Sequence, residues 1–236
     1  MRVLFFGGPM KKLLNYFSRL ELALWLSSIA LILMSFMAFD RTNHLTLIAS
    51  LIGVTSLIFC AKGNPAGQIL MIIFSLLYSV ISYSFAYFGE MVTYLGMTLP
   101  MAIFALISWF RHPYKGNRSQ VQVSGVGKRE QIFMWGLTAA VTVVFYFILK
   151  HFDTTNLLPS TVSVTTSFLA AYLTFRRSPF FALAYAANDM ILIVLWVLAS
   201  LTDTRYISVV VCFVAFLLND LYGFINWRKM KKKQQK

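Results

Sequence analysis

Eight apolar runs constrain the fold of this chain more than any other feature. They occupy residues 22–39, 45–61, 67–88, 91–110, 131–149, 157–175, 179–201 and 206–227. An α-helix rises about 1.5 Å per residue, so roughly 20 apolar residues are needed to cross about 30 Å of hydrocarbon. The runs therefore predict an all-α polytopic membrane protein with eight transmembrane helices.

Composition agrees with a membrane-embedded chain and argues against other classes. Hydrophobic residues make up 58% of the 236 residues and charged residues only 12%, which is too apolar for a soluble domain. The formal net charge of +13 raises the question of nucleic-acid binding. However, most basic residues lie in short stretches that flank or link the apolar runs, as in membrane loops. We therefore expect the lipid bilayer, and not nucleic acid, as a partner.

Cofactor, metal and disulfide chemistry have little support in the sequence. His44, His112 and His151 are solitary loop residues, whereas a metal site needs a cluster of ligands. Cys60 and Cys212 lie inside predicted membrane segments, so no disulfide framework or paired-cysteine metal motif is expected. The same dispersion argues against an intramembrane enzyme, which needs a nucleophile with its base or a metal. We expect no catalytic residues and no cofactor.

The basic residues predict an orientation. Of the 21 Lys and Arg residues, all except Arg41, Lys150 and Arg205 fall on one side of the predicted membrane. Cytoplasmic loops carry an excess of Lys and Arg, and an even number of spans puts both ends on one side, so both termini are expected in the cytoplasm. The first run is long enough to span and no small-residue cleavage site follows it, which favours a retained helix over a signal peptide.

A weak internal repeat suggests an architecture. Residues 62–65 (KGNP) and 176–179 (RRSP) each follow one apolar run and open the next, and the third run of each set ends near Trp109 or Trp227. Two three-helix units joined by one linker helix, 131–149, must have the same orientation. The predicted fold is therefore one N-terminal helix followed by a 3+1+3 parallel repeat.

This repeat divides the chain into five parts. They are an N-terminal segment with the extra helix (1–44), the first three-helix repeat (45–110), a loop with the linker helix (111–156), the second repeat (157–227) and a basic tail (228–236). The tail is expected to contact anionic headgroups. Parallel repeats of this kind place a substrate site near the bilayer midplane, between the units.

Two Asn-Asp pairs, Asn188-Asp189 and Asn219-Asp220, interrupt the last two apolar runs. A carboxylate at the centre of a bilayer helix costs about 2.5 to 3.5 kcal/mol on insertion scales, so it usually faces a partner or a water-filled cavity. Helical rise from the ends of the two runs places the acids roughly 15 and 10 Å deep. We expect both pairs to share one cavity, and we favour a functional role over simple helix-to-helix hydrogen bonding.

Other residues extend this candidate site at helical spacing. An aromatic face beside a carboxylate suits a flat ring that carries positive charge, and amides suit its hydroxyl groups. The first unit offers only uncharged candidates, for which helix packing is an equal alternative. The predicted substrate-binding residues are Tyr185, Asn188, Asp189, Trp196, Asn219, Asp220, Tyr222, Asn226, Gln68, Ser75, Tyr78 and Ser79.

The paired tryptophans give two further predictions. Counting back from them places Pro100 opposite Leu218, so the fourth helix is expected to kink at about the depth of Asn219. Trp109 and Trp227 themselves are expected at the water interface, as members of an aromatic belt.

Several of these motifs resemble a known family. The motifs are the Asn64-Pro65 opening with Gly67, residues 94–100 (YLGMTLP), the Asn188-Asp189 helix, and Asn219-Asp220 followed by Gly223 and Trp227. They resemble the PnuC nicotinamide riboside transporters of bacteria, most closely the Gram-positive branch, over about residues 45–227. That family is related to the SWEET sugar transporters and shares the parallel 3+1+3 repeat.

The resemblance implies a function and an assembly. It implies facilitated diffusion of nicotinamide riboside, an NAD precursor, through a trimer in the bacterial plasma membrane, followed by trapping through cytosolic phosphorylation. The family carries a Trp-x-x-Trp pattern at the start of the seventh helix, where this chain has Ala182 and Tyr185. The alternatives are therefore another vitamin or a (deoxy)nucleoside, and proton coupling through the buried acids. A passive scaffold, which predicts no saturable ligand binding, is the alternative from another class.

Overall fold

The computed structural model describes residues 16–84, 88–154 and 156–235, and these residues are almost entirely helical. The elements are α2 (Arg19–Phe39), α3 (His44–Ala61), α4 (Ala66–Ser84), α5 (Phe88–Thr93), the π-helical η1 (Tyr94–Thr98), α6 (Leu99–Arg111), β1 (Pro113–Tyr114), β2 (Asn117–Val121), α7 (Lys128–His151), α8 (Leu157–Phe175), α9 (Phe180–Ser200), the 3-10 turn η2 (Thr204–Tyr206) and α10 (Ile207–Gln234). Within the described residues, eight helical stretches are long and apolar enough to cross a membrane. The prediction of an all-helical protein with eight spans is confirmed.

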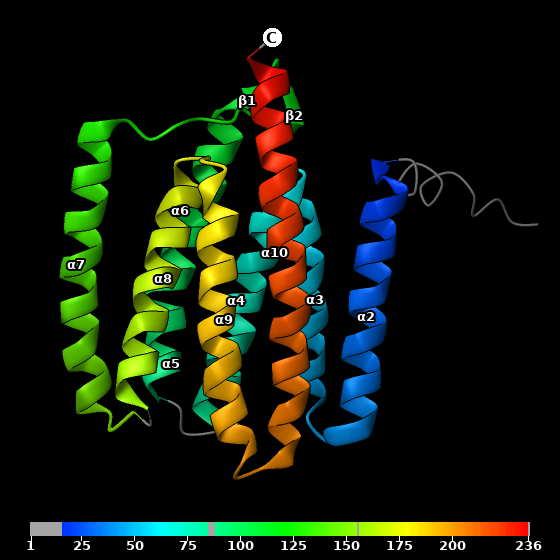
Figure 1. Ribbon diagram of the computed structural model, residues 1–236, viewed down its shortest axis with the longest axis vertical. Helices are drawn as coiled ribbons and strands as arrows, with labels where there is room; N and C mark the ends of the chain where they lie inside the picture. The colour runs from blue at the N-terminus through cyan, green and yellow to red at the C-terminus, as the bar shows by residue number, and fades with distance from the viewer. Residues whose placement is uncertain (1–15, 85–87, 155, 236) are drawn as a thin grey trace, which may run out of the picture.

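The helices stand side by side, with α2 and α7 at the two edges of the bundle (Figure 1). The antiparallel hairpin β1–β2 lies at the same end as the C-terminus. We call this the basic end, because it holds loops 62–65, 112–127 and 176–179 and the basic tail. The other end, with loops 40–43 and 201–203, is the opposite end.

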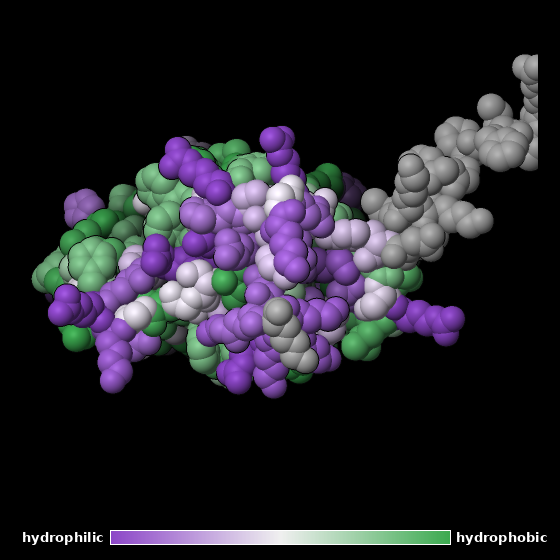
Figure 2. Space-filling view, turned by 90° about the horizontal axis from the view of Figure 1, so that it is seen from above, coloured by the Kyte–Doolittle hydropathy of each residue, from purple (hydrophilic) through white to green (hydrophobic). Residues whose placement is uncertain are grey.

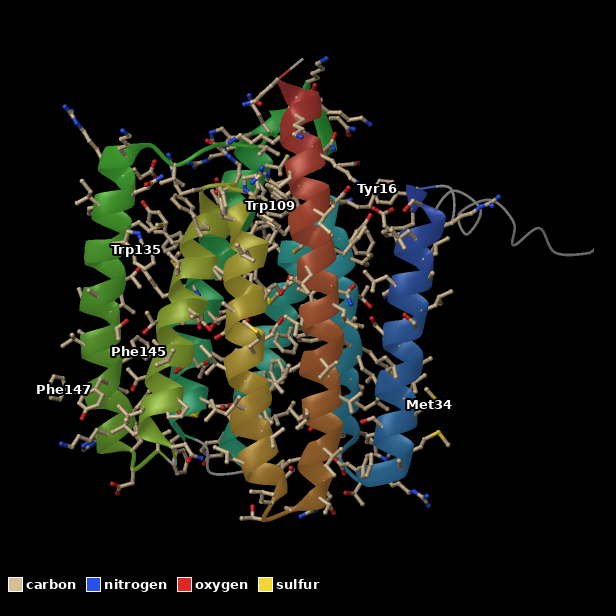
Figure 3. The ribbon with its side chains drawn as sticks, viewed as in Figure 1. Tyr16, Met34, Trp109, Trp135, Phe145 and Phe147 are labelled. Atoms are coloured by element: carbon tan, nitrogen blue, oxygen red, sulfur yellow. The ribbon has the colours of Figure 1, made fainter. Side chains whose placement is uncertain are left out.

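The surface of the bundle is apolar on its flanks and polar at its ends. Seen from the basic end, hydrophilic residues cover the end face and hydrophobic residues form the rim (Figure 2). Met34 on α2 and Phe147 on α7 point away from the bundle (Figure 3) and are 58% and 62% exposed. Such side chains are stable on an outer face only in contact with lipid or another apolar surface, as expected for a membrane protein.

The helix at the C-terminus runs beyond its predicted end. The predicted span stops at Trp227, whereas α10 continues to Gln234. The Gln234 amide explains the extension, because it accepts a hydrogen bond from the Val123 backbone N–H at 2.7 Å and donates one to the Val121 carbonyl at 3.0 Å. The described part of the basic tail therefore docks on the loop after the hairpin.

The fourth span is irregular where Pro100 predicts it. The π-helix η1 separates α5 from α6, and Pro100 is the second residue of α6. Proline has no N–H to donate and its ring crowds the preceding turn, so a helix in front of it must change its hydrogen-bond pattern. Tyr94 and Thr98, the two end residues of η1, line the central cavity described below.

The two three-helix units exchange equivalent hydrogen bonds at the basic end. The Trp109 indole N–H donates to the Thr174 carbonyl at 2.9 Å, and that of Trp227 donates to the Cys60 carbonyl at 2.8 Å. The preceding residues repeat the exchange, with Ser108 Oγ donating to Phe175 O at 2.8 Å and Asn226 Nδ2 to Ala61 O at 2.8 Å. The third helix of each unit thus binds the C-terminal carbonyls of the first helix of the other unit, as a two-fold repeat requires.

The prediction that Trp109 and Trp227 form an interfacial belt is wrong. Their side chains are 1% and 0% exposed, and their ring centroids lie 5.4 Å apart. The physical reason is the pairing just described. A buried indole N–H needs an acceptor, and the carbonyls at a helix end have no donor within the helix. Each of these carbonyls accepts both a backbone N–H from the turn that follows and the indole N–H of the other unit.

The turns after the first helix of each unit are also equivalent. Gly63 and Arg177 both adopt a left-handed conformation, with φ angles of 67° and 56°. Their carbonyls accept hydrogen bonds from Val121 N at 2.9 Å and Ser124 N at 3.0 Å. One short segment of the connecting loop therefore bridges the two units and fixes their spacing at the basic end.

Candidate functional site

A small cavity of about 50 Å³, with polar groups in a mainly apolar lining, lies between the two units. The second unit contributes Tyr185, Asn188 and Asp189 from α9 and Asp220 from α10. The first unit contributes Leu57 from α3, Met71 and Phe74 from α4, and Tyr94 and Thr98 from η1. The two acids expected to share one cavity do line the same space.

The two carboxyl groups give the cavity its chemistry. Asp189 and Asp220 are only 4% and 5% exposed, and their carboxyl groups are close enough to interact with each other. Asp189 Oδ2 has no hydrogen-bond partner among the described residues, and none of the described residues that line the cavity is basic. A buried carboxyl group in these surroundings needs either a proton or a positively charged ligand.

Hydrogen bonds from α8 orient the amide beside these acids. Asn188 Oδ1 accepts from Ser163 Oγ at 3.2 Å and from Thr166 Oγ1 at 2.9 Å. These two bonds occupy the amide oxygen, so the NH₂ group is the part of the amide that remains to donate. Asn188 is thereby positioned as a hydrogen-bond donor at the edge of the cavity.

Aromatic residues that the sequence reasoning missed line the other side. The Phe74 ring lies 6.1 Å from that of Tyr94 and 5.9 Å from that of Phe216, and all three line the cavity. The internal repeat could have predicted part of this aromatic lining. Met71 and Phe74 follow Pro65 at the same spacing at which Tyr185 and Asn188 follow Pro179.

Several predicted site residues instead connect helices. Asn219 Nδ2 donates to Ser28 Oγ of α2 at 2.9 Å, and Tyr222 Oη donates to Glu21 Oε1 of α2 at 3.0 Å. Glu21 also forms an ion pair of 3.0 Å with Lys62. The polar residues of α10 therefore have two different environments. Asp220 lines the cavity, whereas Asn219 and Tyr222 contact the N-terminal helix α2.

The remaining predicted residues also lie outside the cavity lining. Asn226 caps the C-terminus of α3, as described above, and Gln68 Nε2 donates to Cys60 Sγ at 3.3 Å. The hydroxyl groups of Ser75 and Ser79 bond to carbonyls of their own helix. Tyr78 lines a hollow at the opposite end, and Trp196 lines both that hollow and a larger cavity beside it. For Asn226, Gln68, Ser75 and Ser79, the helix-packing alternative describes the observed contacts better.

The central cavity is closed in this structure. Its volume of about 50 Å³ has room for about one or two water molecules, whereas ligand sites typically measure about 300 to 1,000 Å³. A larger ligand would require the two units to separate. Parallel repeats that rock around a buried polar site are the architecture of secondary membrane transporters, and the fold and the cavity together define that class.

Comparison with known proteins narrows the class to one family. Residues 43–229 match the family described as nicotinamide mononucleotide transporter. The match covers most of the chain, so this protein belongs to that family, which includes the PnuC transporters and consists of transporters rather than enzymes.

Two curated relatives and one solved structure show the range of similarity. The chain is 24% identical to the nicotinamide riboside transporter PnuC of Neisseria mucosa, over 89% of this chain and 82% of the relative. It is 22% identical to the protein of the same name from Haemophilus influenzae, over 81% and 82% of the two chains. A crystal structure of the vitamin B3 transporter PnuC is 22% identical, with a TM-score of 0.79 over 92% of this chain and 94% of that one. At that identity, the structural match supports the fold.

Proposed function

We propose that this protein carries nicotinamide riboside across a bacterial plasma membrane. The observation that carries the proposal is the central cavity, in which two buried acids, one oriented amide and several aromatic rings meet without a basic residue among the described lining. Nicotinamide riboside is a flat aromatic cation joined to a sugar with several hydroxyl groups. Each part of that molecule has a matching group in the cavity.

The residues of the cavity take distinct roles in this proposal. Asp189 and Asp220 balance the charge of the pyridinium ring, which compensates the cost of burying the carboxylates. Tyr185 and Tyr94 stack on the ring from the two units. The NH₂ group of Asn188 donates to the ribose or to the carboxamide oxygen.

The charge of the cavity favours the riboside over the mononucleotide after which the family is described. A phosphate group carries about −1.5 to −2 charge at pH 7. Such a group is bound by Arg, Lys or backbone N–H groups, and none of the described lining residues is Arg or Lys. Two buried carboxyl groups would instead repel it, so the mononucleotide is a poor substrate for this cavity.

The transport cycle follows from the repeat. We propose that the two units rock about the central site to open it to each side in turn, that the basic end faces the cytoplasm, and that three copies assemble. Transport is facilitated diffusion, and phosphorylation in the cytosol traps the riboside. Proton coupling is the second candidate, because the unpartnered Oδ2 of Asp189 beside Asp220 is a place to hold a proton.

Uptake by proteoliposomes tests both candidates. Liposomes with the purified protein should accumulate labelled nicotinamide riboside to equilibrium with the medium, and an imposed pH gradient should leave the final level unchanged. Accumulation above equilibrium that follows the pH gradient would replace facilitated diffusion by proton coupling. Failure to take up the riboside at all, with uptake of another vitamin or nucleoside, would overturn the substrate assignment.

A further inference from the structure

A second and larger cavity of about 460 Å³ opens at the opposite end of the bundle. It lies between the start of α5, the connection between α7 and α8, and the last turns of α9. Its volume falls within the range of about 300 to 1,000 Å³ that is typical of ligand sites. Its described lining combines the aromatic residues Phe88, Phe152 and Trp196 with the acids Glu90 and Asp153. We call it the outer cavity.

A narrow polar passage joins the outer cavity to the central one. This passage, of about 30 Å³, shares Glu90 and Ser160 with the outer cavity and Tyr94, Thr98 and Ser167 with the central cavity. Its walls carry several hydroxyl groups. The three spaces therefore follow one another from the opposite end of the bundle to Asp189 and Asp220, with shared side chains between them.

Glu90 occupies the junction between the outer cavity and the passage. Its Oε2 atom is buried and has no hydrogen-bond partner among the described residues. The Tyr78 hydroxyl is close enough to interact with this carboxyl group, but a hydroxyl supplies no positive charge. Among the described residues that line the outer cavity or the passage, none is Lys or Arg. Glu90 is thus a carboxyl residue without a counter-ion among the described residues, and it lines a space large enough for a ligand.

The neighbouring hollow at the same end shows the contrast. There Asp40 accepts hydrogen bonds from Thr42 and Asn43. Hydrogen bonds from Arg205 hold the pKa of Asp203 below its usual range. The acids of the hollow are therefore satisfied by the protein itself, whereas Glu90 is not.

We propose that the outer cavity is a second binding site for the transported cation, in which Glu90 faces the charged ring before the ligand moves through the passage to Asp189. This inference rests on the proposed function, because it takes a flat heterocyclic cation with hydroxyl groups as the ligand. The outer cavity repeats the combination of the central site, with aromatic rings, a carboxylate and hydroxyl or amide groups. It has room for a ligand while the central cavity is closed, so the two sites can be occupied in sequence.

A cysteine reporter tests the outer site directly. Thr202 lines the outer cavity and is exposed, while the native Cys60 and Cys212 are buried. In the Thr202→Cys variant, a cationic methanethiosulfonate reagent should react with the new thiol, and nicotinamide riboside should slow the reaction. At ten times the half-protecting concentration the rate should fall by about tenfold, as simple competition requires. Thr204→Cys is the matched control, because Thr204 is exposed nearby but outside the cavity lining, and no protection is expected there.

Two second-site changes separate the outer site from the central one. Adding Glu90→Gln to Thr202→Cys should raise the half-protecting concentration by about tenfold or more, since the carboxylate that faces the cationic ring is removed. Adding Asp189→Asn instead should leave protection in place, because that residue belongs to the central cavity. Loss of protection with Asp189→Asn would mean that the reporter senses central binding, and it would overturn the outer site.

Calorimetry on the wild-type protein keeps the two proposals distinguishable. If the riboside binds but leaves the Thr202→Cys reaction unchanged, or if Glu90→Gln retains full protection, the outer site is overturned and the proposed function stands. If the riboside does not bind the wild-type protein at all, the proposed function itself fails.

Discussion

The two three-helix units agree at their basic ends and differ at their centres. At the basic end, Trp109 and Trp227 make the same indole-to-carbonyl hydrogen bond to the opposite unit. At the centre, the position of Asp189 in the second unit corresponds to Ser75 in the first, counted from Pro179 and Pro65. The cavity acids belong to the second unit alone among the described residues, and the first unit supplies aromatic and apolar lining.

This difference separates the requirements of folding from those of recognition. Helix ends present the same unsatisfied carbonyls in both units, so the same solution serves twice. A single ligand in a shared cavity has a charged side and an uncharged side, and it therefore needs different groups from each unit. The repeat accounts for the arrangement of the helices, and the positions at which the two units differ are the ones that line the ligand cavity.

Removing either paired tryptophan should have the largest effect. Trp109→Ala and Trp227→Ala should each lower the free energy of unfolding by about 3 to 5 kcal/mol, because each leaves a cavity, and each also removes the indole hydrogen bond to the other unit. Thermal denaturation in detergent measures the change. Trp135→Ala is the control, since Trp135 is 57% exposed on α7 and its loss should cost little. A large effect from only one of the pair would break the equivalence of the two units.

Neutralising the central acid should have the next largest effect, on ligand affinity. Asp189→Asn should weaken nicotinamide riboside binding by about 10- to 100-fold, as expected when one partner of a close, buried charge pair is neutralised. Ser75→Ala is the control at the same repeat position, and it should change the dissociation constant by less than about twofold, because its hydroxyl bonds within α4 and lies outside the cavity lining. Equal losses in both variants would contradict the asymmetry. Titration calorimetry gives both values.

The aromatic residues should contribute less than the acid and from both units. Tyr94→Ala and Tyr185→Ala should each weaken riboside binding by about tenfold, consistent with about 1 to 2 kcal/mol for a desolvated cation over an aromatic ring. Tyr94→Phe and Tyr185→Phe keep the ring and should recover most of the affinity. If the phenylalanine variants bind as weakly as the alanine variants, the hydroxyl groups and not the rings hold the ligand.

The smallest effect on binding is expected at Asn219, which the sequence predicts to be a site residue. Its amide donates to Ser28 on α2, so Asn219→Ala should change riboside affinity by less than about twofold while lowering the free energy of unfolding by about 1 kcal/mol. Binding and thermal unfolding of the same preparation test this. A loss of affinity as large as that of Asp189→Asn would return Asn219 to the binding site.

Most of the fold could be predicted from the sequence because the bilayer imposes helix length and apolarity. The predicted run at 157–175 coincides with α8, and the turn motifs at 62–65 and 176–179 occupy equivalent positions. The end of the C-terminal helix is harder to predict from the sequence, because its last turns depend on the hydrogen bond between Gln234 and Val123, which is distant in the sequence. The tryptophans were misplaced for a similar reason, since the same residue type serves a lipid interface or a buried hydrogen bond.

The candidate site could be predicted only in part. Tyr185, Asn188, Asp189 and Asp220 line the cavity as expected, because an acid in an apolar run is costly wherever it lies. Asn219 gave the same signal, but its partner is on α2, far away in the sequence. Phe74 has no polar group, and Tyr94 is notable in the sequence only as the first residue of the 94–100 motif. Which face of a helix meets which neighbour is a property of the packed bundle, and a single run of residues does not contain it.

Recognition of positive charge by Asp189 and Asp220 is the central claim, and a comparison of the dissociation constants of two ligands tests it most directly. Purified wild-type protein is titrated with nicotinamide riboside and, separately, with nicotinamide mononucleotide, in the same buffer by calorimetry. The structure predicts saturable binding of the riboside and binding of the mononucleotide that is weaker by about 100-fold or more, since a phosphate would meet two buried carboxyl groups. Equal or tighter binding of the mononucleotide would contradict it.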